Sequence, residues 1–175
     1  MKGLVHIYTG EGKGKTTSAI GLGIRAYGRG FKILMVQFLK GNESGEITTL
    51  KGLEPGFTLY RGVQMGKFTW NMDEKELMEA KALQTENLNY AIQQIKENKY
   101  DMLILDEIMA AVTTGLVNLQ DVLDFVKNKP ADLELVMTGR NAPPELVALA
   151  DYVSEIKAVK HPLGKGIPAR HGIED

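Results

Sequence analysis

A glycine-rich stretch near the amino terminus constrains the fold of this chain more than any other feature. It reads TGEGKGKTT from Thr9 to Thr17 and contains Gly14-Lys15-Thr16. An apolar, strand-like segment (residues 3–8) precedes it, and a helix-like segment (16–29) follows it. A glycine-rich turn with Gly-Lys-Thr between a strand and a helix is typical of a phosphate-binding loop, or P-loop. Backbone N–H groups and the helix amino terminus would face an anion there.

The glycine spacing in this loop departs from the usual pattern. The usual motif has a glycine five positions before Gly14, and Thr9 occupies that position here. The glycines stand instead at Gly10, Gly12 and Gly14. We therefore expect a polyphosphate site, but the usual orientation of the nucleotide does not follow. A glycine-rich turn without a ligand is the alternative, and the two lysines of the loop argue against it.

The rest of the chain alternates apolar strand-like segments with helix-like ones. Further strands are expected at 32–38, 57–60, 100–106, 133–138 and 152–156, and further helices at 73–98, 118–128 and 143–150. Strands that are apolar throughout favour a parallel sheet covered on both faces. The prediction is a single α/β domain over residues 1–175 with a P-loop NTPase-like fold: a mostly parallel sheet with helices on both faces. Most of 39–72, and the tail 157–175, are expected to be loop.

Composition narrows the classes of function. The 21 Lys and Arg nearly balance the 22 Asp and Glu, which argues against a protein built to bind nucleic acid. The chain has no cysteine, which excludes disulfides, thiolate zinc sites and a cysteine nucleophile. It shows no signal peptide and no apolar run near the roughly 20 residues that span a bilayer. We therefore expect a cytoplasmic protein without a membrane partner.

A second nucleotide signal is the apolar strand that ends in Asp106-Glu107. A carboxylate at the carboxyl end of a parallel strand faces the ligand crevice. In P-loop proteins such a residue holds or orients Mg²⁺, while the loop lysine lies along the phosphates and its threonine offers a hydroxyl to the metal. We expect one of the two acids to bind the metal and the other to support it. Alternatively, Asp106 caps the segment that follows.

Three features go beyond nucleotide binding. Residues 37–41 leave the second strand toward the same sheet edge, and Phe68-Thr69-Trp70 stands in the loop-rich region. The aromatic pair is either core filling or a wall for a large, flat ligand. The tail carries Lys157, Lys160, His161, Lys165 and Arg170. This group could complement phosphates, although a solvated basic end is the simpler interpretation.

These segments, in this order, resemble the ATP:corrinoid adenosyltransferases of the P-loop type. The resemblance covers nearly the whole chain. It rests on the loop at 9–17 and on VQFLKG (36–41), GE (45–46), FTW (68–70), LDE (105–107), TGR (138–140), ADYVSEIKAVKHP (150–162) and ARHGIE (169–174).

The resemblance implies transfer of the 5′-deoxyadenosyl group of ATP to the Co(I) centre of a corrinoid, with release of inorganic triphosphate. This reaction serves adenosylcobalamin biosynthesis or salvage. The family uses ATP, Mg²⁺ and the corrinoid, and holds the nucleotide in the reverse sense relative to ordinary P-loop hydrolases. The implied partners are a reductase or flavoprotein that donates electrons and a second copy of the chain in a homodimer.

The family's site residues carry over to matching positions. The triphosphate is expected on Thr9, Gly10, Glu11, Gly12, Lys13, Gly14, Lys15, Thr16 and Thr17. Mg²⁺ is expected on Thr16 and Glu107, with Asp106 as a further candidate. The corrinoid is expected to face Gln37, Lys40, Phe68 and Trp70. Lys15, Phe68 and Trp70 are the catalytic candidates. Lys15 is the lysine of the P-loop, and Phe68 and Trp70 resemble the aromatic pair that displaces the lower axial ligand of the corrinoid.

The chain differs from the family pattern in two places, and two alternative functions remain open. Glu11 stands where relatives often have Asn or Asp, and the first strand begins too early for the extension that helps cover the corrinoid in some relatives. A P-loop ATPase or small-molecule kinase would share the loop and the Asp106-Glu107 strand end, but would leave the FTW and tail motifs unexplained. A non-enzymatic carrier of corrinoid or nucleotide would not need a full set of residues for metal and triphosphate.

Overall fold

Six strands form one sheet in the computed structural model, which describes residues 2–39, 41, 44–63 and 71–174. Every pair of neighbouring strands is parallel, and the order across the sheet is β3-β2-β4-β5-β1-β6. The strands are β1 (Val5–Thr9), β2 (Ile33–Gln37), β3 (Phe57–Tyr60), β4 (Met102–Asp106), β5 (Glu134–Thr138) and β6 (Tyr152–Glu155).

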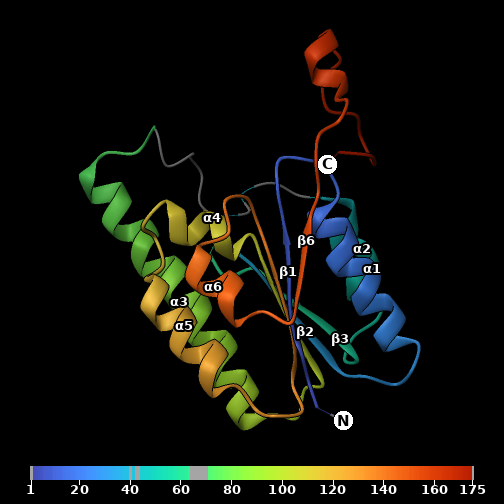
Figure 1. Ribbon diagram of the computed structural model, residues 1–175, viewed down its shortest axis with the longest axis vertical. Helices are drawn as coiled ribbons and strands as arrows, with labels where there is room; N and C mark the ends of the chain where they lie inside the picture. The colour runs from blue at the N-terminus through green and yellow to red at the C-terminus, as the bar shows by residue number, and fades with distance from the viewer. Residues whose placement is uncertain (1, 40, 42–43, 64–70, 175) are drawn as a thin grey trace.

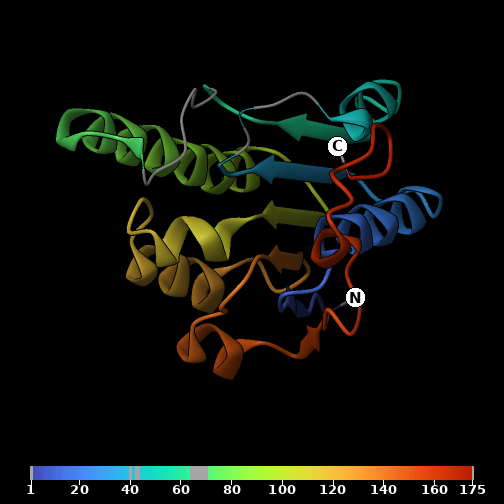
Figure 2. The same ribbon diagram turned by 90° about the horizontal axis from the view of Figure 1, so that it is seen from above.

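Helices cover both faces of the sheet (Figure 1). One face packs against α1 (Lys15–Tyr27) and α2 (Gly45–Lys51). The other face packs against α3 (Glu74–Glu97), α4 (Ile108–Thr113), α5 (Leu119–Asn128) and α6 (Pro144–Leu149). Figure 2 shows the two groups of helices on opposite sides of the strands. Among the described residues, no helix combines the length and apolar character needed to cross a bilayer.

Alternating side chains of each strand divide the core in two. In β2, Ile33 and Met35 belong to the cluster under α1, while Leu34 and Val36 belong to the cluster under α3 and α5. Successive side chains of a strand point to opposite faces, so a strand covered on both sides must be apolar at every position. This explains why β2 and β4 read as continuous apolar runs, and the arrangement confirms the predicted α/β fold.

Two helices lie where the sequence predicted loop or gave no prediction. Helix α2 falls within 39–72; it begins after Ser44 and buries Leu50 against the sheet. Helix α4 follows β4 directly. Both are short, at seven and six residues, so tertiary packing rather than propensity stabilises them. The tail also contains a 3₁₀ turn, η2 (Pro162–Lys165), which the loop prediction missed.

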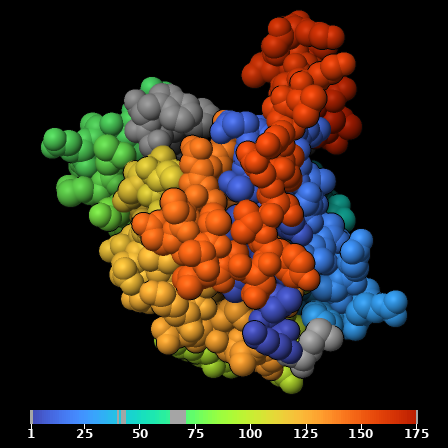
Figure 3. All heavy atoms as spheres, viewed as in Figure 1, coloured from blue at the N-terminus to red at the C-terminus, as the bar shows by residue number. Residues whose placement is uncertain are grey.

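The carboxyl ends of four central strands meet at one edge of the sheet. They end at Thr9, Gln37, Asp106 and Thr138, and the register pairs Gln37 with Asp106. In an open parallel sheet this edge is where ligands bind. The carboxy-terminal tail rises from the same edge and stands out from the body of the molecule (Figures 1 and 3).

Candidate functional site

The glycine-rich loop joins β1 to α1 through Gly14, which precedes the helix with φ of 118°. That positive φ favours glycine, and a Cβ at this position would point into open space. Lys15 follows as the first helical residue and is buried, with 8% of its surface exposed. Its Nζ donates to the carbonyl oxygens of Gly10 (2.7 Å) and Gly12 (2.9 Å). Burial lowers the pKa of Lys15, and the carboxylate of Glu107 opposes that shift.

The other two loop glycines are needed for packing against the segment after β6. A Cβ on Gly10 would lie 2.5 Å from the carbonyl oxygen of Ile156, and one on Gly12 would lie 2.8 Å from the same atom. The N–H of Gly12 donates to that carbonyl at 2.7 Å. The unusual spacing of the glycines therefore has a structural cause: the start of the tail lies directly against the loop.

Asp106 joins the loop to the centre of the sheet. It is fully buried at the end of β4, and its Oδ1 accepts hydrogen bonds from Thr16 (2.8 Å) and Thr138 (2.7 Å). Its Oδ2 accepts from the side-chain amide of Gln37 at 3.2 Å. Three donors from α1, β5 and β2 satisfy a carboxylate that burial would otherwise penalise. Asp106 therefore has a larger structural role than capping.

Glu107 has a strained backbone at the start of α4. Its φ is 62° and its ψ is 20°, a left-handed conformation that non-glycine residues seldom adopt. Its N–H donates to Oγ1 of Thr138 at 2.9 Å, so one hydroxyl contacts both acids. Such strain persists where the surroundings enforce it, often at functional sites. Here it accompanies a carboxylate-bearing residue that lines the cavity beside the loop.

The cavity in front of the loop has a volume of about 480 Å³. The loop and α1 form one wall, the start of α2 forms a second, and the tail forms a third. The lining residues are Lys13, Gly14, Lys15, Thr16, Thr17, Ile20, Ser44, Gly45, Glu46, Glu107, His161, Gly172, Ile173 and Glu174. The cavity is thus built from segments far apart in the sequence.

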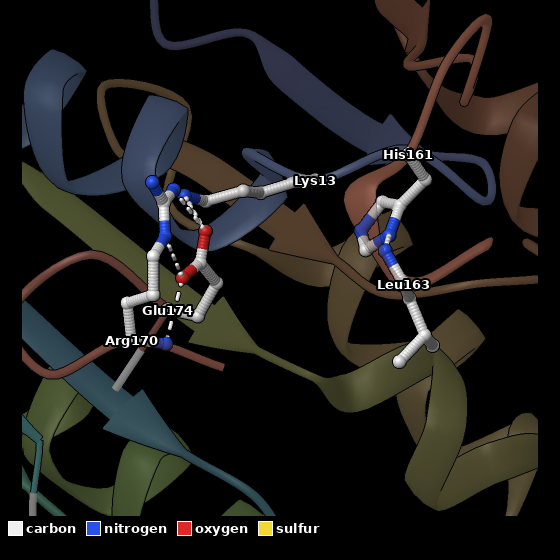
Figure 4. A network of polar contacts seen from close by, with 5 residues as sticks. All are labelled: Lys13, His161, Leu163, Arg170 and Glu174. Atoms are coloured by element: carbon white, nitrogen blue, oxygen red, sulfur yellow. Dashed lines mark hydrogen bonds and ion pairs between the residues drawn. The ribbon is translucent and has the colours of Figure 1, made fainter. Parts of the chain in front are cut away.

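The tail side of this cavity carries its own polar network (Figure 4). Glu174 is ion-paired with both Lys13 of the loop and Arg170 of the tail. Nδ1 of His161 accepts a hydrogen bond from the N–H of Leu163 at the start of η2. The simpler interpretation of the tail, a solvated basic end, is therefore incomplete, because part of the tail folds back onto the loop.

The structure brings some of the predicted site residues together and separates others. Residues Lys13–Thr17 line the cavity, and Thr16 contacts Asp106. Residues 9–12 lie outside the lining; the carboxylate of Glu11 instead forms an exposed ion pair with Arg140 at 3.2 Å. Gln37 is buried beside Asp106, and a contact with a corrinoid stays a prediction for it. Lys40, Phe68 and Trp70 lie outside the described residues.

The residues present fit a Mg²⁺ ion. Hydroxyl and carboxylate oxygens are the ligands this metal prefers, and Thr16, Asp106 and Glu107 supply them. Oε1 of Gln37 is buried without a hydrogen-bond partner, so one acceptor at this place has capacity left. Within the described ranges, no cluster of three or more His, Cys, Asp or Glu could hold a metal by itself. Mg²⁺ commonly takes one or two protein oxygens and completes its shell with phosphates and water.

Sequence reasoning quoted Glu46 in a family motif but gave it no role. Its Oε1 accepts from the amide of Gln37 at 3.2 Å, and it lines the cavity in the first turn of α2. Ser44 also lines the cavity, and its buried Oγ has no hydrogen-bond partner. A helix signal was present here: Ser44 as N-cap, with Ile47 and Leu50 three residues apart. The surrounding glycines obscured it.

Comparison with known proteins matches nearly the whole chain to one family. The model of the family described as ATP:corrinoid adenosyltransferase BtuR/CobO/CobP matches residues 1–174. The corrinoid adenosyltransferase of Escherichia coli K12 is 34% identical over 174 residues, which are 99% of this chain and 86% of that protein. The Pseudomonas aeruginosa PAO1 enzyme is 35% identical over 99% of this chain and 84% of its own length. Corrinoid adenosyltransferase CobA of Salmonella typhimurium LT2 is 32% identical, with 99% and 86% covered.

Proposed function

Because this chain belongs to the ATP:corrinoid adenosyltransferase family BtuR/CobO/CobP, we propose that it transfers the 5′-deoxyadenosyl group of ATP to the cobalt of a reduced corrinoid. The observation in the structure that carries the proposal is the junction of loop and sheet. Thr16 of the loop contacts Asp106 at 2.8 Å, at the edge of a cavity that Lys13–Thr17 line. This arrangement suits a nucleotide whose triphosphate is the leaving group.

The proposed step is a displacement at carbon rather than at phosphorus. The electron pair of Co(I) attacks C5′ of ATP, a cobalt–carbon bond forms, and the C5′–O bond breaks. The leaving oxygen keeps the pair of that bond, so inorganic triphosphate departs and the cobalt becomes formally Co(III). The nucleophile carries no proton, and the protein therefore needs no general base. It has to hold the triphosphate and align C5′ with the cobalt.

The loop residues supply the positive field for the leaving group. We assign the triphosphate to residues 9–17, with Lys15 closest to the chemistry and the N–H groups at the start of α1 facing the phosphates. Two of the three Lys15 donors already bind loop carbonyls, and the third can serve a phosphate oxygen. The remaining loop residues position the backbone.

We assign the Mg²⁺ ion to the carboxylates at the end of β4 and the hydroxyl of Thr16. Thr16 and Glu107 would hold Mg²⁺, with Asp106 orienting Thr16 and Gln37 linking this group to Glu46. When bound, Mg²⁺ neutralises charge that develops on the leaving triphosphate. Thr138 holds Asp106 and the backbone of Glu107 in place.

We propose that Phe68 and Trp70 exclude the lower axial ligand, which would make Co(II) easier to reduce, and that Gln37 and Lys40 face the corrinoid. A reductase or flavoprotein would supply the electron. We further propose that residues 1–175 act as one domain in a cytoplasmic homodimer. Light scattering and cell fractionation would test the last two points.

The first experiment is an anaerobic incubation with ATP, Mg²⁺ and chemically reduced Co(I) corrinoid. The expected result is a light-sensitive alkylcorrinoid spectrum together with an equal amount of triphosphate. Lys15→Ala is expected to lower kcat/KM at least 100-fold, because one preorganised charge contact to the reacting group contributes about 10²–10³. Lys75→Ala, which removes an exposed lysine of α3, is the matched control and should retain wild-type activity.

The same incubation separates the alternative functions. ADP and orthophosphate with an unchanged corrinoid would contradict the proposal and favour an ATPase. A phosphorylated acceptor would favour a kinase. Binding of ATP and corrinoid without any product would favour a carrier.

A further inference from the structure

The carboxy-terminal tail places a carboxylate in the cavity of the phosphate-binding loop. Glu174 lines that cavity, and its Oε1 lies 3.0 Å from Nζ of Lys13, a residue 161 positions earlier. Figure 4 shows the Glu174 carboxylate in contact with both Lys13 and Arg170. The side chain of Glu174 is only 18% exposed, although Lys13 is 45% exposed. A cation of the loop is therefore already paired with an anion that the chain itself provides.

Arg170 fixes this carboxylate in place. The guanidinium of Arg170 donates to both oxygens of Glu174, at 3.1 Å from Nε and 2.9 Å from Nη2. The backbone N–H of Arg170 donates to Oε2 at 2.9 Å. A bidentate contact of this kind holds a carboxylate in one orientation. The tail thus presents Glu174 to Lys13 as a preorganised anion.

A bound triphosphate would meet this carboxylate at the same lysine. Both groups are anionic, both are small oxygen acceptors, and Lys13 has a single ammonium to offer. The triphosphate would carry the larger charge, so it can draw Lys13 away from the carboxylate. Arg170 keeps Glu174 satisfied if Lys13 leaves it, so exchange of Lys13 from Glu174 to a phosphate leaves no ion unpaired.

We propose that Glu174 is a positioning residue that competes with triphosphate for Lys13. The inference rests on the proposed function, in which triphosphate is a product that has to leave. Tight binding of the leaving group assists the chemical step but slows release of the product. A carboxylate that takes Lys13 back shifts this balance toward release.

The test measures binding of inorganic tripolyphosphate with Mg²⁺ by isothermal titration calorimetry. Glu174→Gln removes the competing charge and should bind tripolyphosphate about fivefold tighter, since Lys13 can then contact a phosphate without giving up a partly exposed ion pair of modest strength. Glu155→Gln is the matched control: it removes an exposed carboxylate, paired with Lys157 at 3.3 Å, and should leave the affinity within twofold.

A second pair of variants tests the route through Lys13. In a Lys13→Ala background, Glu174→Gln should change tripolyphosphate affinity less than twofold, because the shared lysine is gone. A purely structural role for Glu174 predicts a different pattern. Glu174→Gln alone would weaken tripolyphosphate binding, or it would change the affinity equally with and without Lys13. Either result overturns the proposal, as does the absence of tripolyphosphate binding by the wild type.

The adenosyl-transfer assay tests the proposed function independently of the tripolyphosphate affinities. If tripolyphosphate affinities follow the expected pattern but no alkylcorrinoid forms, the proposed function fails while the competition between Glu174 and polyphosphate is supported. Circular dichroism of each variant confirms that the fold is retained before affinities are compared.

Discussion

The hydroxyl of Thr138 fixes the positions of the two acids of the site, Asp106 and Glu107, relative to each other. It donates to Oδ1 of Asp106 at 2.7 Å and accepts from the N–H of Glu107 at 2.9 Å. Thr138 is fully buried, so no solvent can replace it. Since the φ of Glu107 is positive, this hydrogen bond also opposes relaxation of a strained backbone.

Thr138→Val should therefore weaken both stability and metal binding. The side chain keeps its shape but leaves the half-buried N–H of Glu107 without this acceptor, which costs about 1–3 kcal/mol in the free energy of unfolding. Urea denaturation measures that loss, and titration of activity with Mg²⁺ should show a higher half-saturating concentration. Thr113→Val is the control: Thr113 is exposed, and its hydroxyl bonds a carbonyl of its own helix. If both variants behave alike, Thr138 does not organise the acids.

Among single residues, the sequence predicted those that belong to a local motif and missed the contacts between segments far apart in the chain. Thr16 and Asp106 could be placed because each directly adjoins an apolar strand or a known loop motif. The contact of Glu46 with Gln37 and that of Glu174 with Lys13 join segments whose approach depends on tertiary packing. No local pattern encodes such an approach, so the roles of Glu46 and Glu174 emerged only from the structure.

Helix α1 contains two glycines with opposite surroundings, although they are two residues apart. A Cβ on Gly21 would meet nothing within 4 Å. A Cβ on Gly23 would lie 2.7 Å from the ring of Phe57 and 3.1 Å from Ile104. Gly23 thus lets the helix approach the sheet closely behind the loop, while Gly21 has no such role.

Alanine at these two positions should change stability in opposite directions. Gly21→Ala should raise the free energy of unfolding by about 0.5–1 kcal/mol, because alanine loses less conformational entropy in a helix. Gly23→Ala should lower it by about 1–3 kcal/mol, because the new methyl group overpacks the core. Chemical denaturation compares the two variants with wild type. Stabilisation by Gly23→Ala would mean that Phe57 moves aside at little cost.

Elements were predicted best where hydrophobic pattern and end signals agreed. The helix expected at 73–98 occupies Glu74–Glu97, and Asp73 caps its amino terminus, reinforced by Glu76. Helix α4 could not be predicted in this way, because it starts from a left-handed glutamate rather than a normal N-cap. Its position depends on burial of Ile108 and Met109 against the sheet.

On the scale of the whole molecule, the fold brings the loop after the first strand and the carboxy-terminal tail to one site. The loop follows the first strand, and the tail follows the last, which pairs beside it. Ile156, immediately after β6, packs on Gly10 and Gly12, and the tail then continues to Glu174 at Lys13. The order of strands thus makes the tail a wall of the cavity in front of the glycine-rich loop. A sequence can suggest a basic tail, but only this topology shows where it lies.

The same arrangement predicts how the tail responds to pH. Hydrogen bonds from the Arg170 side chain and backbone, followed by the one from Lys13, lower the pKa of Glu174 from 4.5 to about 2. A depressed pKa means that the contact is fully present above pH 4.5 and is lost as the pH falls toward 2. The pairing with Lys13 should therefore persist throughout the pH range of enzyme assays. Carbon-detected NMR of the Glu174 carboxyl should show no titration between pH 8 and pH 5.

Substitution of Arg170 or Lys13 shows which of the two residues lowers the pKa of Glu174 more. Arg170→Gln should raise the pKa of Glu174 more than Lys13→Gln does, since the bidentate Arg170 contact is the largest cause of the shift. The reverse order would mean that the loop, rather than the tail itself, holds the carboxylate. In that case Glu174 could not remain satisfied when Lys13 turns to a phosphate. Exchange of Lys13 between the two anions would then be costly, and the titration would count against the competition inferred above.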